Sequence, residues 1–384
     1  MTMCLHFFIE YDPEGTPSKH HIPRRVPQCK EMEKTTMKKN VAVIGYGGMG
    51  AGFHCKNLLT SDVCNLAGIY DIDEAKRDLA ASRGIKVYNT REELLADPTI
   101  DIVTIATPND VHEEIAIAAL EAGKHVLSEK PVTLSMESLE RMIAASKKAG
   151  KIFSVHQNRR FDVDALAMKQ IAQSGELGEV INIESRIHGS RGIPSDWRGI
   201  KKYGGGMLYD WGIHIIDQAC QILGYDVKSV RCTFDHITNK EVDDGFQLWI
   251  EYTSGKKAYC EVGTYNFIDM PRFYMRAEKG TAIIPHWTIP AHVVKCKAWH
   301  ESDVLPVVNA SGLTKTMAPR DSITVDEYDI PKPSSDVHDY YRNFVRAMDG
   351  LEEQMVTHDQ MRTVLKVIMT AFESVEKGGD KVVW

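Results

Sequence analysis

One stretch of this chain combines a run of glycines with an acid and a base at helical spacing. Residues 204–206 are all glycine, and the polar residues of the segment that follows are Asp210, His214, Asp217 and Gln221. At about 100° per residue these four side chains form one narrow stripe on a helix, and apolar residues fill the other side. A helix with this pattern is mostly buried, so we expect its polar stripe to face a bound cofactor.

The acid and the base of this stretch suit the removal of a proton from a hydroxyl group. His214 can accept a hydroxyl proton near neutral pH while hydride leaves the same carbon. Asp210 lies one turn earlier, where it can orient the imidazole or share the substrate hydroxyl with it. The alternative is structural, with Asp210 as a helix cap and His214 as a core histidine. The glycine run and the otherwise apolar helix favour the catalytic interpretation.

A lysine in the sequence Glu129-Lys130-Pro131 is a further catalytic candidate. It follows a short apolar strand predicted at residues 125–127, and the proline biases Lys130 toward an extended backbone. Near a nicotinamide ring, Lys130 could hydrogen-bond a substrate hydroxyl and stabilise negative charge that develops on the oxygen. A solvated surface lysine is an equally good explanation of this tripeptide alone.

A glycine-rich turn follows the first strongly apolar segment of the chain, at residues 41–44. This turn reads Gly45-Tyr46-Gly47-Gly48-Met49-Gly50, and helix-compatible residues continue to about Leu59. Its first glycine permits a tight turn, the second lets the backbone approach a pyrophosphate, and the third lets the helix pack on the strand. The order of strand, glycine turn and helix therefore predicts a dinucleotide site.

An acidic residue at the end of the next predicted strand indicates whether the dinucleotide is NAD or NADP. The apolar run at residues 66–70 ends at Asp71, about 20 residues beyond the last glycine of the turn. A carboxylate there accepts hydrogen bonds from ribose hydroxyls and repels a 2′-phosphate, so Asp71 favours NAD over NADP. The alternative is that Asp71 merely caps the helix that begins near Asp73.

Other polar and aromatic residues are less specific. Asn158, Arg159 and Arg160 follow the last predicted parallel strand, where they could face the substrate cleft or, equally well, form a solvated hinge. Trp197 and Tyr265 could stack on a sugar ring, although such aromatic residues more often belong to a core. The histidines show no HExxH or paired-ligand spacing, so we expect no metal site.

Strands and helices alternate over the first part of the chain and predict a parallel sheet. Strands are expected at 41–44, 66–70, 86–88, 102–106, 125–127 and 152–155, with helices near 72–82, 91–96, 111–122 and 136–149. In such a sheet, ligands bind outside the carboxyl ends of the strands, where residues 107–109 and 129–131 lie. We therefore predict an N-terminal α/β domain with a doubly wound parallel sheet at residues 39–158.

The second part of the chain changes to strands separated by turn residues. Strands are expected at 180–188, 229–236, 246–252, 257–262, 273–277 and 293–298, beside helices near 164–174, 336–348 and 359–376. Turns such as 253–255 and 278–280 predict a large, mainly antiparallel open sheet. Residues 159–384 are thus expected to form an α+β domain.

Composition sets limits on the class of protein. The 384 residues suit two domains, and a net charge of −7 argues against nucleic acid or an anionic membrane as partner. No stretch is long and apolar enough to span a bilayer. Eight cysteines without CxxC spacing predict reduced thiols in a cytoplasmic protein. Residues 1–38 lack periodicity and are expected to form a disordered leader, or an arm that contacts another subunit.

Together, these motifs resemble the glucose-fructose oxidoreductase and inositol dehydrogenase family of NAD(P)-dependent sugar and polyol dehydrogenases. The resemblance rests on the glycine turn, Thr107-Pro108-Asn109 followed by His112, Glu129-Lys130-Pro131, and residues 204–214 with Asp217. It implies an N-terminal Rossmann domain at residues 39–158. It also implies that residues 159–384 form a domain for substrate binding and oligomerisation, whose open sheet often forms a dimer or tetramer interface.

The resemblance also implies a catalytic set of Lys130, Asp210 and His214. The cofactor NAD would then be bound by the glycine turn and the strand ends, through Gly45, Tyr46, Gly47, Gly48, Met49, Gly50, Asp71, Thr107, Pro108, Asn109, His112, Glu129 and Lys130. The substrate-binding candidates are Asn158, Arg159, Trp197, Asp210 and His214.

The function expected from the sequence is NAD-dependent oxidation of a ring hydroxyl of a sugar, glycoside or cyclitol to a ketone. The partner would be a small molecule, and the enzyme would be a homo-oligomer. Two alternatives remain at this stage. One is a redox-neutral, NAD-dependent glycosidase-like enzyme that oxidises its sugar only transiently, and the other is a non-catalytic sugar or nucleotide sensor on the same fold.

Overall fold

The computed structural model describes residues 37–297, 307–308, 314–315, 320 and 322–384. The described residues from Lys38 to Trp384 form one unit. The predicted leader lies outside the described residues except for Met37 and Lys38. Within the described ranges, no helix is long and apolar enough to cross a membrane.

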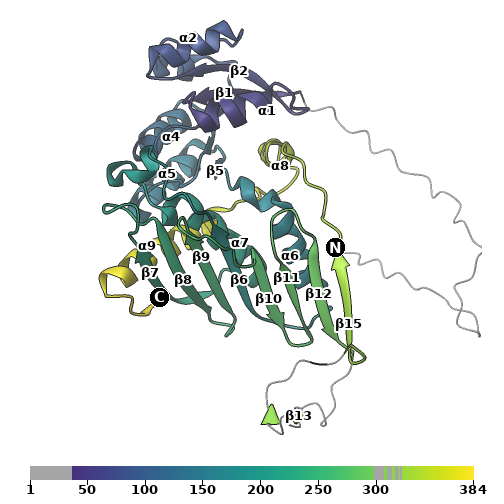
Figure 1. Ribbon diagram of the computed structural model, residues 1–384. Helices are drawn as coiled ribbons and strands as arrows, with labels where there is room; N and C mark the ends of the chain where they lie inside the picture. Colours follow the sequence, from purple (N-terminus) through teal and green to yellow (C-terminus); the bar gives the residue numbers. More distant parts are fainter. Residues whose placement is uncertain (1–36, 298–306, 309–313, 316–319, 321) are drawn as a thin grey trace, which may run out of the picture. The chain divides into compact units, whose positions relative to one another are not determined.

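The first part of this unit is a five-stranded parallel sheet, as predicted (Figure 1). Its strand order is β2-β1-β3-β4-β5, so the order reverses between β1 and β3, which is where doubly wound sheets bind their ligands. The strands are β1 (Lys39–Ile44), β2 (Cys64–Tyr70), β3 (Ile102–Ile105), β4 (His125–Ser128) and β5 (Phe153–Val155). The connecting helices are α1 (Lys56–Leu58), α2 (Glu74–Ser82), α3 (Arg91–Ala96), α4 (His112–Glu121) and α5 (Met136–Ala149).

The second part is a nine-stranded sheet in the order β15-β12-β11-β10-β6-β9-β8-β7-β16. All of its neighbouring strands are antiparallel except β6 and β9, which confirms a mainly antiparallel open sheet. Its strands are β6 (Val180–His188), β7 (Val227–Asp235), β8 (Gly245–Tyr252), β9 (Lys257–Gly263), β10 (Phe273–Ala277), β11 (Gly280–Ile284), β12 (Ala291–Cys296), β15 (Val325–Ile330) and β16 (Val382–Val383). A separate short pair joins β13 (Val307–Val308) to β14 (Thr314–Lys315).

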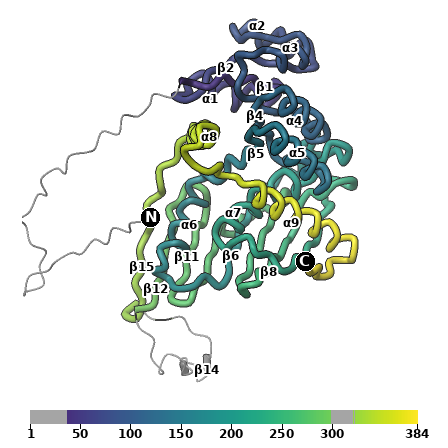
Figure 2. Tube along the Cα trace, turned by 180° about the vertical axis from the view of Figure 1, so that it is seen from behind, coloured from purple at the N-terminus to yellow at the C-terminus, as the bar shows by residue number. Residues whose placement is uncertain are grey.

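Helices cover one face of the nine-stranded sheet. Figure 2 shows α6 (Val163–Ser174), α7 (Ile213–Leu223) and α9 (His358–Glu376) over this face, and their apolar side chains share one core with the strands. Helix α9 begins with a capping box, in which Thr357 and Gln360 satisfy each other's backbone N–H groups. The helix that carries His214 is therefore held between the sheet and its neighbouring helices.

Helix α8 (Asp339–Met348) belongs to the other core. Tyr340, Tyr341, Phe344 and Val345 pack with the apolar residues of the parallel sheet, although more than 180 residues separate α8 from β5. The C-terminal segment thus returns to the N-terminal sheet before α9 joins the large one.

Several predicted elements differ from the structure. The strand predicted at 86–88 is wrong, because only Val87 forms a single bridge to Ile69 of β2. Five strands of the described residues were not predicted, namely β11, β13, β14, β15 and β16. The acidic sequence of β15 has no clear alternation, because this edge strand pairs through its backbone and only Val325 among its side chains is buried.

Candidate active site

The glycine turn after β1 is shaped by close backbone contacts. Gly45 has a φ of 98°, and a Cβ atom there would lie 2.4 Å from the carbonyl oxygen of Ala106. A Cβ atom on Gly50 would lie 1.9 Å from the oxygen of Gly45, so both positions require glycine. By contrast, Gly47 and Gly48 face open space, which leaves their backbone free to approach a ligand. This geometry fits the pyrophosphate of a dinucleotide beside the π-helix Gly50–Cys55.

Asp71 lies at the end of β2 and is buried. One carboxylate oxygen accepts a hydrogen bond from the backbone N–H of Tyr46 at 2.7 Å, and the other accepts from Asp73 N–H at 2.9 Å. The N-cap of α2 is Asp73 itself. Asp71 therefore joins the glycine turn to the start of α2, and it does more than cap that helix.

The residues after β3 form hydrogen bonds to neighbouring loops. The side-chain amide of Asn109 donates to the carbonyl oxygen of Tyr203, 3.0 Å away. The two ring nitrogens of buried His112 each lie 3.0 Å from a backbone oxygen, one of Pro131 and one of Thr107. These contacts connect the loop at 107–109 to the segments that contain Tyr203 and Pro131, so the position of the loop is coupled to theirs.

Glu129 is the centre of a buried polar cluster that comprises His54, Glu129 and His156. One Glu129 oxygen lies 2.8 Å from His54 Nε2 and 2.7 Å from His156 Nδ1, and His54 Nδ1 lies 2.9 Å from the Tyr341 hydroxyl. Burial alone would raise the pKa of Glu129, but His156 and His54 hold it well below its usual range. The other carboxylate oxygen accepts a hydrogen bond from Lys130 N–H at 3.2 Å, so the cluster fixes the backbone of Lys130.

This cluster is also the one group among the described residues whose side chains lie close enough to share a metal ion. The sequence spacing predicted no metal site, and the contacts of Glu129 account for the arrangement by hydrogen bonding. His156 follows β5 just as Glu129 follows β4, so the strand-end rule that selected Glu129 could also have found His156. His54 has no comparable signal in the sequence.

Lys130 and Asp210 meet between the two sheets. Lys130 Nζ lies 2.9 Å from Asp210 Oδ1 and 2.9 Å from the Asp210 carbonyl oxygen. Arg198 Nε donates to the other carboxylate oxygen at 2.8 Å, a partner that the sequence did not suggest. Burial would raise the pKa of Asp210, but Lys130 and Arg198 lower it below its usual value. Asp210 is therefore an ionised acceptor held from both sides.

His214 is buried one turn after Asp210. Its Nδ1 atom is inaccessible to solvent and has no hydrogen-bond partner among the described residues. Burial, together with the positive charges of Lys130 and Arg159, holds the pKa of His214 well below 6.5. The imidazole is thus neutral near pH 7 and able to accept a proton.

One cavity of about 660 Å³ brings most of these side chains together. Its lining includes the predicted residues Met49, Lys130, Asn158, Arg159, Asp210 and His214, and also Trp211, which the sequence did not single out. Trp197 is not part of the lining and instead stacks with Arg198. The cavity therefore places the lysine, the acid and the histidine around one space.

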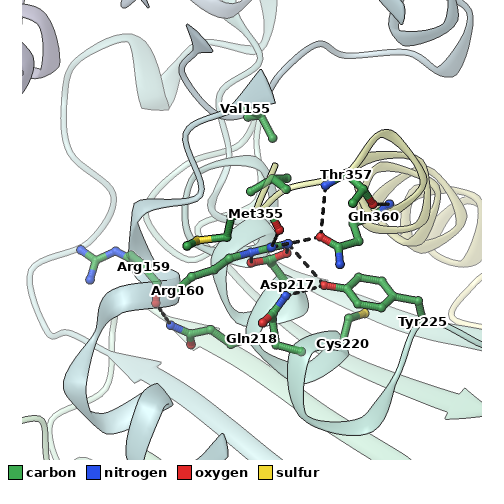
Figure 3. Close-up of polar contacts among 12 residues, drawn as sticks. Val155, Arg159, Arg160, Asp217, Gln218, Cys220, Tyr225, Met355, Thr357 and Gln360 are labelled. Carbon is green, nitrogen blue, oxygen red and sulfur yellow. Dashed lines mark hydrogen bonds and ion pairs between the residues drawn. The ribbon is translucent and has the colours of Figure 1, made fainter. Parts of the chain in front are cut away.

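The polar stripe that contains His214 divides between two roles. Asp210 and His214 line the cavity. Asp217 instead pairs with Arg160 at 2.6 and 2.8 Å (Figure 3), and Gln221 accepts a hydrogen bond from Lys169 at 2.7 Å. The expectation that the whole stripe faces a cofactor is therefore wrong for its second half. In this second half, Asp217 balances the buried positive charge of Arg160, which lies in the segment after β5.

Known proteins share this fold and its motifs. The model of an oxidoreductase family with an NAD-binding Rossmann fold matches residues 39–157, and that of the GFO/IDH/MocA C-terminal domain matches residues 165–283. The crystal structure of an NAD-binding protein from Listeria innocua is similar to this chain, with 41% identity and a TM-score of 0.85 over 91% of this chain and 100% of that one.

Two named enzymes are also similar. The scyllo-inositol 2-dehydrogenase (NADP(+)) IolW of Bacillus subtilis is 28% identical over 87% of this chain and 93% of its own length. The D-glucoside 3-dehydrogenase of Escherichia coli is 30% identical over 56% and 63%, respectively. The chain spans about half the length of three further curated relatives that are 38 to 39% identical. By both of its matched domains, the chain belongs to the GFO/IDH/MocA family of oxidoreductases.

Proposed function

We propose that this protein is an NAD-dependent dehydrogenase that oxidises a ring hydroxyl of a sugar, glycoside or cyclitol to a ketone. The observation that carries the proposal is the single cavity lined by Lys130, Asp210 and His214. Similar enzymes are named for their action on an inositol and on glucosides, which supports a polyhydroxylated ring as substrate.

The three side chains have complementary roles. The Lys130 ammonium, 2.9 Å from Asp210, can donate a hydrogen bond to the substrate hydroxyl and stabilise negative charge on its oxygen. Neutral His214 accepts the hydroxyl proton, because its lowered pKa keeps it unprotonated near pH 7. The hydrogen bonds of Asp210 to Lys130 and Arg198 keep the lysine aimed into the cavity. Bound NAD supplies the acceptor for the hydride that leaves the same carbon.

The choice of NAD rests on Asp71. Its carboxylate lies at the strand end that faces the adenosine ribose in this fold, and it would repel a 2′-phosphate. Lys76 Nζ lies 3.7 Å from the same carboxylate and reduces that repulsion, so NAD is expected to be preferred without complete exclusion of NADP.

The test is NAD reduction with a panel of inositols, free hexoses and aryl glucosides. His214→Ala should abolish NADH formation while NADH binding, followed by fluorescence, is retained. His292→Ala is the matched control, because His292 lies on β12 outside the cavity and should leave turnover unchanged. Retained turnover in His214→Ala would refute its role as the base.

The same panel distinguishes the remaining alternatives. Glycoside cleavage without NADH build-up would identify a redox-neutral enzyme, and NADH binding without turnover of any compound would favour a sensor. A homo-oligomer remains a prediction, for which light scattering of the purified protein is the direct measurement.

A further inference from the structure

The side chains that line the cavity carry a net positive charge, whereas the chain as a whole is net negative. Overall, 53 acidic residues exceed 46 Lys and Arg residues. The described lining of the cavity instead contains four cationic side chains and one carboxylate, that of Asp210. The cations are Lys130, Arg159, Arg191 and Arg198.

Ion pairs account for three of these cations. Lys130 and Arg198 both bind Asp210, and Arg198 also binds Asp196 at 2.7 Å. Arg159 pairs with Asp162 through Nη1 at 3.0 Å. Neither Asp196 nor Asp162 lines the cavity, so these two carboxylates hold the cations from outside it. The one carboxylate in the described lining, that of Asp210, is already paired with Lys130 and Arg198.

Arg191 differs from the other three. It lies on the loop between β6 and Trp197, it lines the cavity, and it has no ion pair or hydrogen bond within the described ranges. An exposed arginine without a partner is unremarkable on an open surface. Beside three further cations in one cavity it adds a positive charge that nothing in the described protein balances, so the cavity favours an anionic ligand.

Arg159 is arranged to act on the same ligand. Its guanidinium group lies 4.0 Å from the ring centroid of Trp211, which also lines the cavity, and 5.7 Å from that of Trp287. Stacking and the single bond to Asp162 fix the group while Nε and Nη2 have no hydrogen-bond partner among the described residues. A planar guanidinium with free N–H groups matches the oxygens of a carboxylate or a phosphate.

We propose that the substrate is an anionic sugar or cyclitol, a ring that carries a carboxylate or a phosphate group bound by Arg191 and Arg159. This inference rests on the proposed dehydrogenase function and narrows its substrate class. The ring hydroxyl to be oxidised would lie at Lys130 and His214, and the anionic group would be bound by the two arginines, which line the same cavity.

The test compares ring compounds in neutral and anionic pairs. Methyl β-D-glucoside against methyl β-D-glucuronide tests a carboxylate, and myo-inositol against myo-inositol 1-phosphate tests a phosphate. For each pair, kcat/KM for NAD reduction and the Kd for binding to the NADH-loaded protein, by calorimetry, are measured. The wild-type protein should prefer the anionic member of at least one pair by about tenfold or more, and that pair identifies the group.

Variants connect the preference to the arginines. Arg191→Gln should reduce the ratio of anionic to neutral kcat/KM by about 10- to 100-fold, as expected for the loss of one charge-assisted hydrogen bond. Arg159→Gln should act in the same direction. Arg276→Gln is the control, because Arg276 is exposed on β10 outside the cavity, and it should change neither ratio.

The outcomes separate this inference from the proposed function. Preference for the neutral members, or an unchanged ratio in Arg191→Gln, overturns the inference even when dehydrogenase activity is present. Weaker NADH binding in Arg191→Gln with an unchanged ratio overturns it as well, because the cation then serves the cofactor. If no compound is oxidised, the proposed function fails, and the calorimetric Kd ratios still decide whether the cavity selects anions.

Discussion

Replacing Arg160 by methionine should destabilise the protein strongly. The guanidinium group forms a two-pronged ion pair with Asp217, and it also donates to the Met355 carbonyl oxygen at 2.6 Å and to Gln360 at 3.0 Å. Both side chains of the pair are almost completely buried, with exposed fractions of 4% and 3%. Arg160→Met leaves Asp217 charged and unpaired in the interior, which costs about 3–5 kcal/mol of unfolding free energy.

The size of this loss is measured by urea unfolding followed by fluorescence. A double variant, Arg160→Met with Asp217→Leu, removes both charges and should recover most of the lost stability, because desolvation of the pair offsets much of its attraction. Arg362→Met is the matched control, since Arg362 pairs with Glu140 at an exposed site and should cost less than about 1 kcal/mol. A single variant as mild as this control, or a double variant worse than Arg160→Met, would refute the reasoning.

Three further predictions concern the active site. The lowered pKa of His214 means that the base is protonated only well below pH 6.5, so the acid limb of kcat/KM against pH should lie below 6.5, and a limb above that value would contradict the assignment. Gly206→Ala should cost about 1–3 kcal/mol and most of the activity, because φ is 108° there and the added Cβ would lie 2.1 Å from an Asp243 oxygen. Gly52→Ala, which meets no atom within 4 Å, is its control in the same unfolding and turnover assays, and equal losses would count against the steric explanation. Asp71→Ser should raise the ratio of NADP to NAD kcat/KM, and an unchanged ratio would show that Asp71 does not select the cofactor.

Local patterns allowed the sequence to predict much of the fold. The glycine turn, the alternation of strands with helices and the turn at 278–280 each depend on residues within a few positions of one another, and the structure confirms them. The prediction at 86–88 failed because a three-residue run has no periodicity with which to distinguish a strand from a single bridge. Edge strand β15 was missed because its pairing depends on β12, about 30 residues earlier.

The candidate site was predictable where each residue belongs to a local motif. Lys130, Asp210 and His214 were selected in this way, and they line one cavity. The partners that hold them were not, because His54 contacts Glu129 from 75 residues away and Arg198 lies in a single short 3-10 helix, Trp197–Gly199, ahead of Asp210. Such contacts depend on the tertiary arrangement, and a single sequence contains no signal for them.

The return of α8 to the parallel sheet has a consequence for the order in which this chain folds during synthesis. Tyr341 hydrogen-bonds to His54 and Thr104, and Tyr340 to Ser154, so these polar contacts of the N-terminal core depend on residues translated long after the parallel sheet. A ribosome-bound chain that stops before α8 has made every strand of the parallel sheet but lacks the Tyr341 hydroxyl that contacts His54 and the apolar side chains with which α8 packs on this core. The nucleotide-binding half is therefore completed only after residues 339–348 have been made.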